Sequence, residues 1–283
     1  MTGTILVLGG TGTVGSKLAD ALKAQGAAFR IATRNPKTAD EVRFDFADPA
    51  TFGEAFEGVD RAFLLSPTGY SDPIALLTPV LDYAIERGIK VVFQTAFGVN
   101  ASDDIPFRQM ELKLERSGVP YVILRPNWFS DNFGFYWLAQ VHKGELRLPA
   151  ADGKTSFIDA RDVADCAAAA LLTDRFDKNA YDLTGPEAVS YGETAEILSS
   201  VLGRRIAYQP VDDETFVSEG VAAGLPEDYA TMIAGIFSLV RMGVPAHVTD
   251  SVRTMTGREP RRVDAYIRDN ATHLGKANAS AVA

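Results

Sequence analysis

Residues 4–22 read Thr-Ile-Leu-Val-Leu-Gly-Gly-Thr-Gly-Thr-Val-Gly-Ser-Lys-Leu-Ala-Asp-Ala-Leu, and the hydrophobic pattern changes in the middle of this stretch. The apolar run at 5–8 is typical of a strand that is buried on both faces. From Val14 onward, apolar residues recur at the spacing of a helix, at positions 14, 18, 21 and 22. The stretch therefore predicts a strand that passes into a helix through a tight, glycine-rich turn.

The glycines of this turn have the G-x-G-x-x-G spacing of a dinucleotide-binding site. Gly10 is expected to permit the turn, Gly12 to let a pyrophosphate approach the backbone, and Gly15 to let the helix lie close to the strand. A purely structural turn is the alternative, but the strand before it and the helix after it favour a nucleotide site, with the helix-start amides facing phosphates. The predicted cofactor contacts here are Gly10, Thr11, Gly12, Thr13, Val14 and Gly15.

Length and charge suit one nucleotide-binding domain with a smaller second lobe. The 283 residues can bury a full core, and a net charge of −9 argues against nucleic acid or an anionic membrane as the main partner. Cys166 is the single cysteine, which indicates a reducing compartment, and it is expected to be a buried small residue rather than a catalytic thiol. Because no signal peptide or membrane-spanning run is recognised, we expect a cytoplasmic protein, as a monomer or homodimer.

The end of the second predicted strand, residues 29–33, is where folds of this kind discriminate between NAD and NADP. An acidic residue there would bind the ribose 2′-hydroxyl. This chain has Arg34 instead, with Lys37 nearby, and cations at that place match a 2′-phosphate. The sequence therefore predicts NADP(H) as the cofactor, with NAD(H) or a merely solvated basic loop as the alternatives.

Later strand ends add candidates to the same site. Asp45, in a third strand expected at 42–46, would either accept a hydrogen bond from the adenine amino group or cap the turn. The fourth strand, 61–65, leads into a loop expected to line the cofactor cleft, and the fifth, 89–95, ends where a nicotinamide would lie. The further residues predicted to contact cofactor are Leu65, Ser66, Thr95 and Ala96, and those predicted to contact substrate are Tyr70 and Phe97.

Strands and helices alternate as far as a sixth strand at 119–124, which predicts an α/β fold with a doubly wound parallel sheet of the Rossmann type. We expect a nucleotide-binding domain over residues 1–150. A smaller α/β substrate lobe would occupy most of 151–283, with a strand at 181–184 returning to the first sheet. This second lobe should contain a helix at 162–172 and a capping box that begins at Ser190, and it should end in a helix at 258–270.

The sequence resembles the NmrA-like atypical short-chain dehydrogenase/reductases. The resemblance rests on Gly-Gly-Thr-Gly-Thr-Val-Gly at 9–15, Ala-Thr-Arg-Asn-Pro at 32–36 and Glu-Arg-Ser-Gly-Val-Pro-Tyr-Val-Ile-Leu-Arg-Pro-Asn-Trp-Phe at 115–129, and it continues at 155–164, where Asp162 would cap a helix. Within the group, the chain looks most like triphenylmethane and quinone reductases and the festuclavine dehydrogenase-like branch. The resemblance implies an NADP(H)-dependent reductase, or a relative that binds NADP without turnover and serves as a redox sensor.

One departure affects the chemistry, because the Tyr-x-x-x-Lys pair of ordinary short-chain dehydrogenases is missing. Phe107 stands where several relatives place a histidine or lysine, and Glu111 matches the family pattern but is expected to be solvated or structural. No catalytic residue is therefore assigned, and an epimerase or dehydratase of nucleotide sugars is disfavoured. Hydride transfer to a cationic dye or a conjugated imine creates no alkoxide, whereas quinone reduction needs a proton from water or a pocket hydroxyl.

The segment 127–137 is rich in aromatic residues and directly follows the sixth strand. Its position predicts a pocket wall for a flat, apolar small molecule, with Trp128, Phe129 and Asn132 as the substrate-binding residues; an aromatic packing cluster is the alternative. His142 is expected at the surface. No pattern in the sequence predicts a metal site.

Overall fold

The computed structural model describes residues 3–67 and 73–275, and it divides into two compact units. Unit 1 comprises Met1–Pro126, Ala160–Leu183 and Asp250–Arg258, and unit 2 comprises Asn127–Asp159, Thr184–Thr249 and Glu259–Ala283. The chain thus leaves unit 1 after Pro126 rather than near residue 150, and it returns twice. Each unit is therefore assembled from segments that are far apart in the sequence.

Unit 1 is built on a parallel sheet, as the alternating pattern predicts. In the described part of the chain this sheet has seven strands in the order β3-β2-β1-β4-β5-β6-β9, with every neighbouring pair parallel. The order runs outward in both directions from β1 and β4, as in doubly wound nucleotide-binding folds. The strands are β1 (Thr4–Leu8), β2 (Phe29–Thr33), β3 (Glu41–Arg43), β4 (Val59–Leu65), β5 (Lys90–Gln94), β6 (Tyr121–Pro126) and β9 (Asn179–Leu183).

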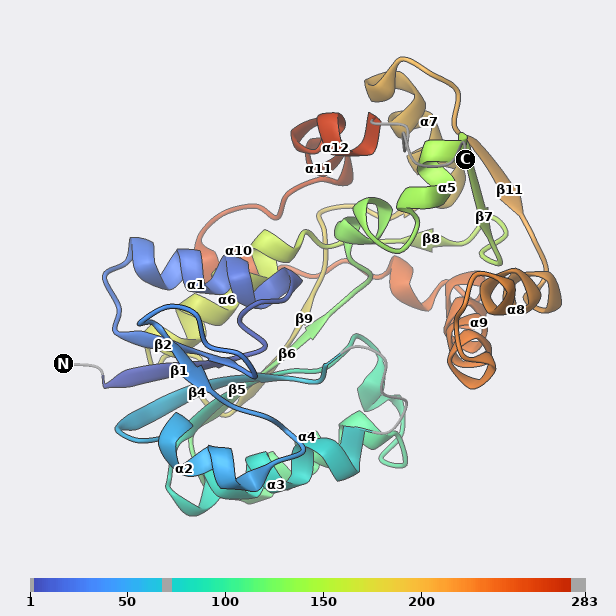
Figure 1. Cartoon of the computed structure of the whole chain (residues 1–283). Coiled ribbons are helices and arrows are strands. Elements are labelled where there is room, and N and C mark those ends of the chain that lie inside the picture. The colour runs from blue at the N-terminus through green and yellow to red at the C-terminus, as the bar shows by residue number, and fades with distance from the viewer. Residues whose placement is uncertain (1–2, 68–72, 276–283) are drawn as a thin grey trace. The chain divides into compact units, whose positions relative to one another are not determined.

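Helices cover both faces of this sheet (Figure 1). On one face a core of buried residues joins the sheet to a short helix α2 (Phe52–Ala55) and to α3 (Pro73–Glu86) and α4 (Pro106–Arg116). On the other face, α1 (Thr13–Ala24) packs against α6 (Ala160–Leu172), which also contacts α10 (Ser251–Thr256). Burial on both faces explains why β1 reads as an unbroken apolar run.

Two predicted boundaries in unit 1 are wrong. The third strand is shorter than the predicted 42–46 and ends at Arg43, because Asp45 begins a turn in which its carboxylate accepts a hydrogen bond from the Ala47 amide at 3.0 Å. Helix α6 begins at Ala160, so Asp162 lies in its first turn rather than at a capping position before it.

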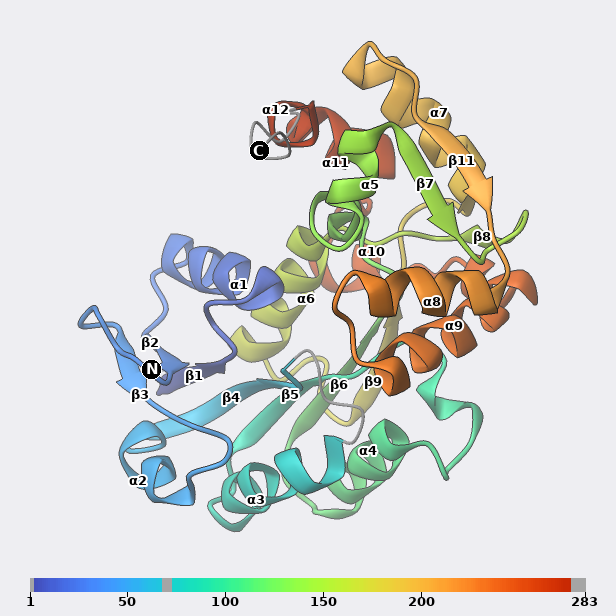
Figure 2. The same cartoon turned by 45° about the vertical axis from the view of Figure 1, so that its right-hand side comes forward.

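Unit 2 contains two small sheets and a set of helices around an aromatic core. β7 (Glu145–Leu148) pairs in parallel with β11 (Ala207–Pro210), and β8 (Lys154–Thr155) pairs antiparallel with β10 (Val189–Ser190). The capping box at Ser190 is present and begins α7. The helices are α5 (Leu138–Lys143), α7 (Tyr191–Leu202), α8 (Asp213–Ala222), α9 (Glu227–Arg241), α11 (Val263–Asp269) and α12 (Ala271–Gly275), as Figure 2 shows from a second side.

The last predicted helix, 258–270, is wrong in its first part. Helix α10 ends at Thr256 and is followed by Gly257, whose φ of +73° lies in the left-handed region that favours glycine, and α11 begins only at Val263. Pro260 lies between the two helices and cannot donate a helical backbone hydrogen bond. In residues 3–67 and 73–275, no helix is both long and apolar enough to cross a membrane.

Candidate functional site

The carboxyl ends of the strands of unit 1 lie in one row. Leu8 is the Cα partner of Ala32, Leu65 of Gln94, and Gln94 of Leu124. Because the strands are parallel, the residues that follow them emerge at the same edge of the sheet. The structure therefore brings to one edge the segments that follow β1, β2, β4 and β5, where the sequence placed its cofactor contacts.

The glycine turn has the predicted strand-turn-helix form, but Gly10 has another role than the one expected of it. Gly9, not Gly10, adopts a positive φ of +73°. Gly10 is needed for a different reason, because a Cβ on it would lie 2.6 Å from Cγ2 of Ile31 on β2. Gly9 thus makes the bend, and Gly10 allows the close approach of the neighbouring strand. The G-x-G-x-x-G spacing does not show that these two roles belong to different residues.

Gly15 has the packing role that the spacing predicts. A Cβ at this position would lie 2.2 Å from the Gly9 carbonyl oxygen and 2.6 Å from Gly10 Cα, so only glycine lets α1 approach the turn this closely. No side chain caps the start of α1 in the described residues. Thr11, Gly12 and Thr13 are exposed there, whereas Val14 is buried. An exposed, uncapped helix start is the arrangement to which phosphate groups bind.

The loop after β2 leaves its cations free. Glu41 Oε2 accepts hydrogen bonds from the amides of Lys37 and Thr38, which ties the loop back to the start of β3. Arg34 and Lys37 are exposed, and within the described residues neither side chain has a recorded partner. These two cations are therefore available to an anionic ligand.

Asp45 and Leu65 lie in settings that differ from each other. One carboxylate oxygen of Asp45 accepts the Ala47 amide, which is the turn-capping role that the sequence left open beside adenine recognition. Leu65 contacts the glycine turn, since a Cβ on Gly9 would lie 3.0 Å from its Cδ1. Ser66 is half-buried, and the predicted Tyr70 lies outside the described residues.

A buried polar network stands where β5 and β6 end. Thr95 Oγ1 donates to Glu111 Oε1 at 2.7 Å, and Arg125 donates to both oxygens of the same carboxylate, from Nε at 2.9 Å and from Nη2 at 2.7 Å. Arg108 Nη1 adds a fourth hydrogen bond at 2.9 Å. Of the two settings expected for Glu111, solvated or structural, the structural one is present, because none of its surface is exposed.

The charge of Glu111 is stabilised by its partners. Burial alone would raise the pKa of this carboxyl, but the hydrogen bonds from Arg125 and Thr95 and the charge of Arg125 outweigh it, so the pKa lies below its usual value. Since the Thr95 hydroxyl donates its proton to the Glu111 carboxylate, this hydrogen bond fixes the position of the end of β5. Ala96 and Phe97 follow, half-buried, and the Phe97 amide donates to the Pro126 carbonyl at 3.0 Å.

Arg108 and Arg125 are the residues of this network that sequence reasoning missed. Arg108 also forms two hydrogen bonds to Glu115, about two turns further along α4. An arginine inside the otherwise apolar strand β6 is a signal for a buried partner, because an unpaired buried charge is strongly unfavourable. Phe107 packs against the apolar core.

The aromatic segment of unit 2 divides into buried and exposed rings. Phe133 and Trp137 are buried, and Trp128 packs on Trp137 and on Phe237, with ring centroids 6.0 and 4.8 Å apart. The packing-cluster alternative thus accounts for part of this segment. Phe129 and Asn132 are half-buried, whereas Phe135 and Tyr136 are 68% and 50% exposed.

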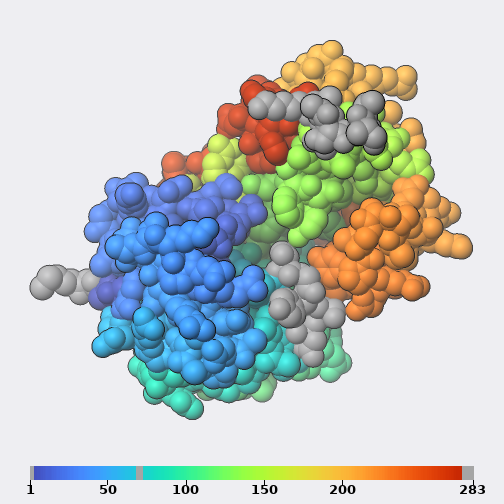
Figure 3. Space-filling model, in the orientation of Figure 1, coloured from blue at the N-terminus to red at the C-terminus, as the bar shows by residue number. Residues whose placement is uncertain are grey.

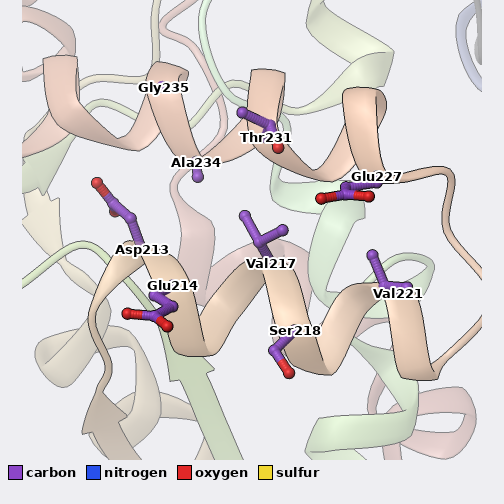
Figure 4. Close-up of a pocket in the computed structure, with 9 residues that line it drawn as sticks. All are labelled: Asp213, Glu214, Val217, Ser218, Val221, Glu227, Thr231, Ala234 and Gly235. Carbon is purple, nitrogen blue, oxygen red and sulfur yellow. The ribbon is translucent and has the colours of Figure 1, made fainter.

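A surface groove lies between α8 and α9 of unit 2. Figure 3 shows the surface of these two helices in orange. Val217 and Ala234 point into the space between the helices, and Asp213 and Glu227 lie at its opposite ends (Figure 4). None of the predicted site residues lines this groove. It is lined by Asp213, Glu214, Val217, Ser218, Val221, Glu227, Thr231, Ala234 and Gly235.

The remaining candidates have structural settings. Cys166 is fully buried in α6, and burial together with the nearby carboxylates of Asp162 and Asp165 raises the pKa of its thiol. His142 Nε2 lies 3.3 Å from the His273 carbonyl oxygen, in a contact between α5 and α12. Among the described residues, no group of three or more histidine, cysteine, aspartate or glutamate side chains is arranged to hold a metal ion.

Comparison with known proteins places the chain in a family. Its sequence matches the NmrA-like family over residues 1–267. It is 34% identical to the uncharacterized oxidoreductase YesF of Bacillus subtilis, over 95% of this chain and 96% of that protein. It is 30% identical to the NAD(P)H azoreductase of Xenophilus azovorans, over 96% of this chain and all of that protein.

A solved structure has the same fold. The NADPH complex of the Escherichia coli quinone oxidoreductase QOR2 superimposes with a TM-score of 0.83 at 22% identity, covering 96% of this chain and all of the other. At this level of identity the likeness concerns the fold alone. The family match covers both units, and it shows that this chain belongs to the NmrA-like family.

Proposed function

We propose that this chain is an NADPH-dependent reductase that transfers hydride to a small aromatic or conjugated acceptor, such as a quinone, a dye or an imine. The observation that carries the proposal is the glycine turn at the same sheet edge as Arg34; among the described residues no side chain caps the helix start at this turn and none pairs with Arg34. The first feature suits a pyrophosphate and the second a 2′-phosphate. The oxidoreductase and azoreductase relatives support a reductase.

In this proposal the residues at the sheet edge bind and orient the cofactor, which when bound would supply the hydride. The turn residues 10–15 would hold the pyrophosphate, Arg34 and Lys37 the 2′-phosphate, and Thr95 and Ala96 would flank the nicotinamide. Asp45 retains a second carboxylate oxygen that could accept from adenine. Because the Thr95 hydroxyl already donates to Glu111, we do not assign it as a proton donor.

The chemistry that fits such a site is hydride transfer that depends mainly on how the site orients the cofactor and the acceptor. A cationic dye or a conjugated imine accepts hydride without forming an alkoxide, so no acidic side chain is needed in the same step. A quinone would take its proton from water. We propose that unit 2 contributes Trp128, Phe129 and Asn132 to acceptor binding. Phe135 and Tyr136 are further candidates for acceptor binding, because their rings are exposed.

NADPH oxidation, followed optically across a panel of quinones, dyes and imines, tests the proposal. Turnover with at least one acceptor, faster with NADPH than with NADH, is expected. The second candidate is a non-catalytic NADP sensor. Two observations favour it: the Thr95 hydroxyl already donates its proton to Glu111, and the sequence has no Tyr-x-x-x-Lys pair. Tight NADPH binding without turnover of any acceptor would support the sensor and contradict the reductase.

A further inference from the structure

We propose that Arg43 is a second phosphate-binding residue of the candidate cofactor site, and that it acts with Arg34 to select a nucleotide carrying a 2′-phosphate. This inference rests on the proposed NADP(H) site and extends it to a residue on another strand. The usual sequence rule examines only the end of the second strand. Arg43 stands at the end of the third.

The strand register places Arg43 beside the start of the Arg34 loop. Arg43 is the Cα partner of Thr33, the last residue of β2, and the amide that follows it, on Phe44, donates to the Thr33 carbonyl at 2.9 Å. Cα partners in neighbouring strands direct their side chains to the same face of the sheet. Arg34 directly follows Thr33, so the two arginines come from adjacent positions at one corner of the sheet.

The face on which Arg43 lies is the face of the glycine turn. Val42 belongs to the core on the side of α2 and α3, so its neighbour Arg43 faces the opposite side. Ile31 lies two residues before Thr33 and shares its face, and its Cγ2 is the atom that a Cβ on Gly10 would approach to 2.6 Å. Arg43 thus lies on the side of the sheet where the turn that would hold the pyrophosphate packs against β2.

The charges at this corner favour an anionic ligand. Arg34 and Arg43 are exposed and have no recorded partner within the described residues, whereas Arg30, on the same strand β2, donates to the carbonyls of Glu54 and Glu57. Glu41, the acidic residue on the same face, is used to hold the loop amides of Lys37 and Thr38. Two free guanidinium groups can each present a pair of N–H donors to a phosphate, which a ribose 2′-hydroxyl does not require.

Nucleotide binding by the variants Arg43→Ala and Arg43→Lys tests this role. Calorimetric titration of the full chain with NADPH, NADH, 2′,5′-ADP and 5′-AMP separates the 2′-phosphate from the rest of the nucleotide. Arg43→Ala should weaken NADPH and 2′,5′-ADP about tenfold, the effect expected of losing one charge-assisted hydrogen bond, and leave NADH and 5′-AMP within about twofold. Arg43→Lys, which keeps the charge but not the paired donors, should fall between Arg43→Ala and the wild type.

Arg116→Ala is the matched control, because Arg116 is also an exposed arginine of unit 1 without a recorded partner in the described residues, but it lies at the end of α4. It should leave all four affinities unchanged. An unchanged ratio of NADPH to NADH affinity in Arg43→Ala, or an equal loss in Arg116→Ala, would overturn the assignment. If the wild type binds neither dinucleotide, the proposed cofactor site fails together with this inference. If it binds NADPH but reduces no acceptor, only the reductase proposal fails.

Discussion

Arg125 Nη2 lies 2.7 Å from Glu111 Oε2, and this buried ion pair joins the end of β6 to the middle of α4. Arg125 Nε and Thr95 Oγ1 both reach the other carboxylate oxygen, so the ends of β5 and β6 are held by one side chain. Two charges removed from water are tolerable only when their hydrogen bonds are satisfied, which is the case here. The pair therefore fixes the geometry of the sheet edge at which the nicotinamide is proposed to lie.

Removal of the Glu111 carboxylate should strongly destabilise the protein. Glu111→Ala removes the carboxylate that accepts both hydrogen bonds of the buried Arg125 and leaves this guanidinium, among the described residues, only its 3.7 Å ion pair with Asp182. Breaking a buried pair in this way typically costs about 3–5 kcal/mol of unfolding free energy. Glu115→Ala is the control, because Glu115 pairs with Arg108 but is partly exposed, and its loss should cost at most about 1 kcal/mol. Urea unfolding at pH 7 measures both. Equal, small losses in the two variants would show that the buried network does not stabilise the fold.

Stability should fall in acid because of the same carboxyl. The pKa of Glu111 is lower in the folded chain than its usual 4.5, so this group stabilises the protein above that pH. The contribution is lost as the pH falls below about 4.5 and through the lower folded pKa. Urea midpoints measured from pH 7 to pH 3 should drop for the wild type. In Glu111→Gln this share of the pH dependence should be absent, and a curve parallel to that of the wild type would count against the assignment.

Two glycines should respond to alanine in opposite directions. Gly15→Ala places a Cβ 2.2 Å from the Gly9 carbonyl oxygen, so the turn must shift, at a cost of about 1–3 kcal/mol or more. Gly235→Ala, within α9, meets no heavy atom of the described residues within 4 Å and should gain roughly 0.5–1 kcal/mol from helix propensity. Thermal unfolding compares the two. A neutral Gly15→Ala would mean that α1 does not pack as closely as the structure has it.

Arg34→Ala should discriminate between the two nicotinamide cofactors. Loss of the guanidinium removes a charge-assisted contact to the 2′-phosphate, so NADPH affinity should fall about tenfold or more while NADH affinity changes little. Fluorescence titration of both nucleotides measures the effect, with Arg116→Ala as the control. Equal losses for NADPH and NADH would contradict the assignment of Arg34 to the 2′-phosphate.

The order of elements in unit 1 is accessible from the sequence because it depends on short-range patterns. The apolar run before Gly9, the helical spacing after it and the repeated alternation predict the parallel sheet, and the sheet is present. Boundaries are less well predicted where turns compete with strands, as at Asp45, or where glycine and proline divide a helix, as at Gly257 and Pro260. The role of Gly10 shows the same limit, since its neighbour Ile31 belongs to another strand.

The sequence by itself determined that the chain has a glycine turn between a strand and a helix, and that a basic residue rather than an acidic one follows the second strand. Both are properties of neighbouring residues. Only the tertiary structure decided that Glu111 is buried among Thr95, Arg108 and Arg125, and that Arg43 stands beside the Arg34 loop. The reason is physical: the burial and charge of a side chain depend on which strand or helix packs next to it. That pairing is set by sheet register and core packing across segments that are distant in sequence.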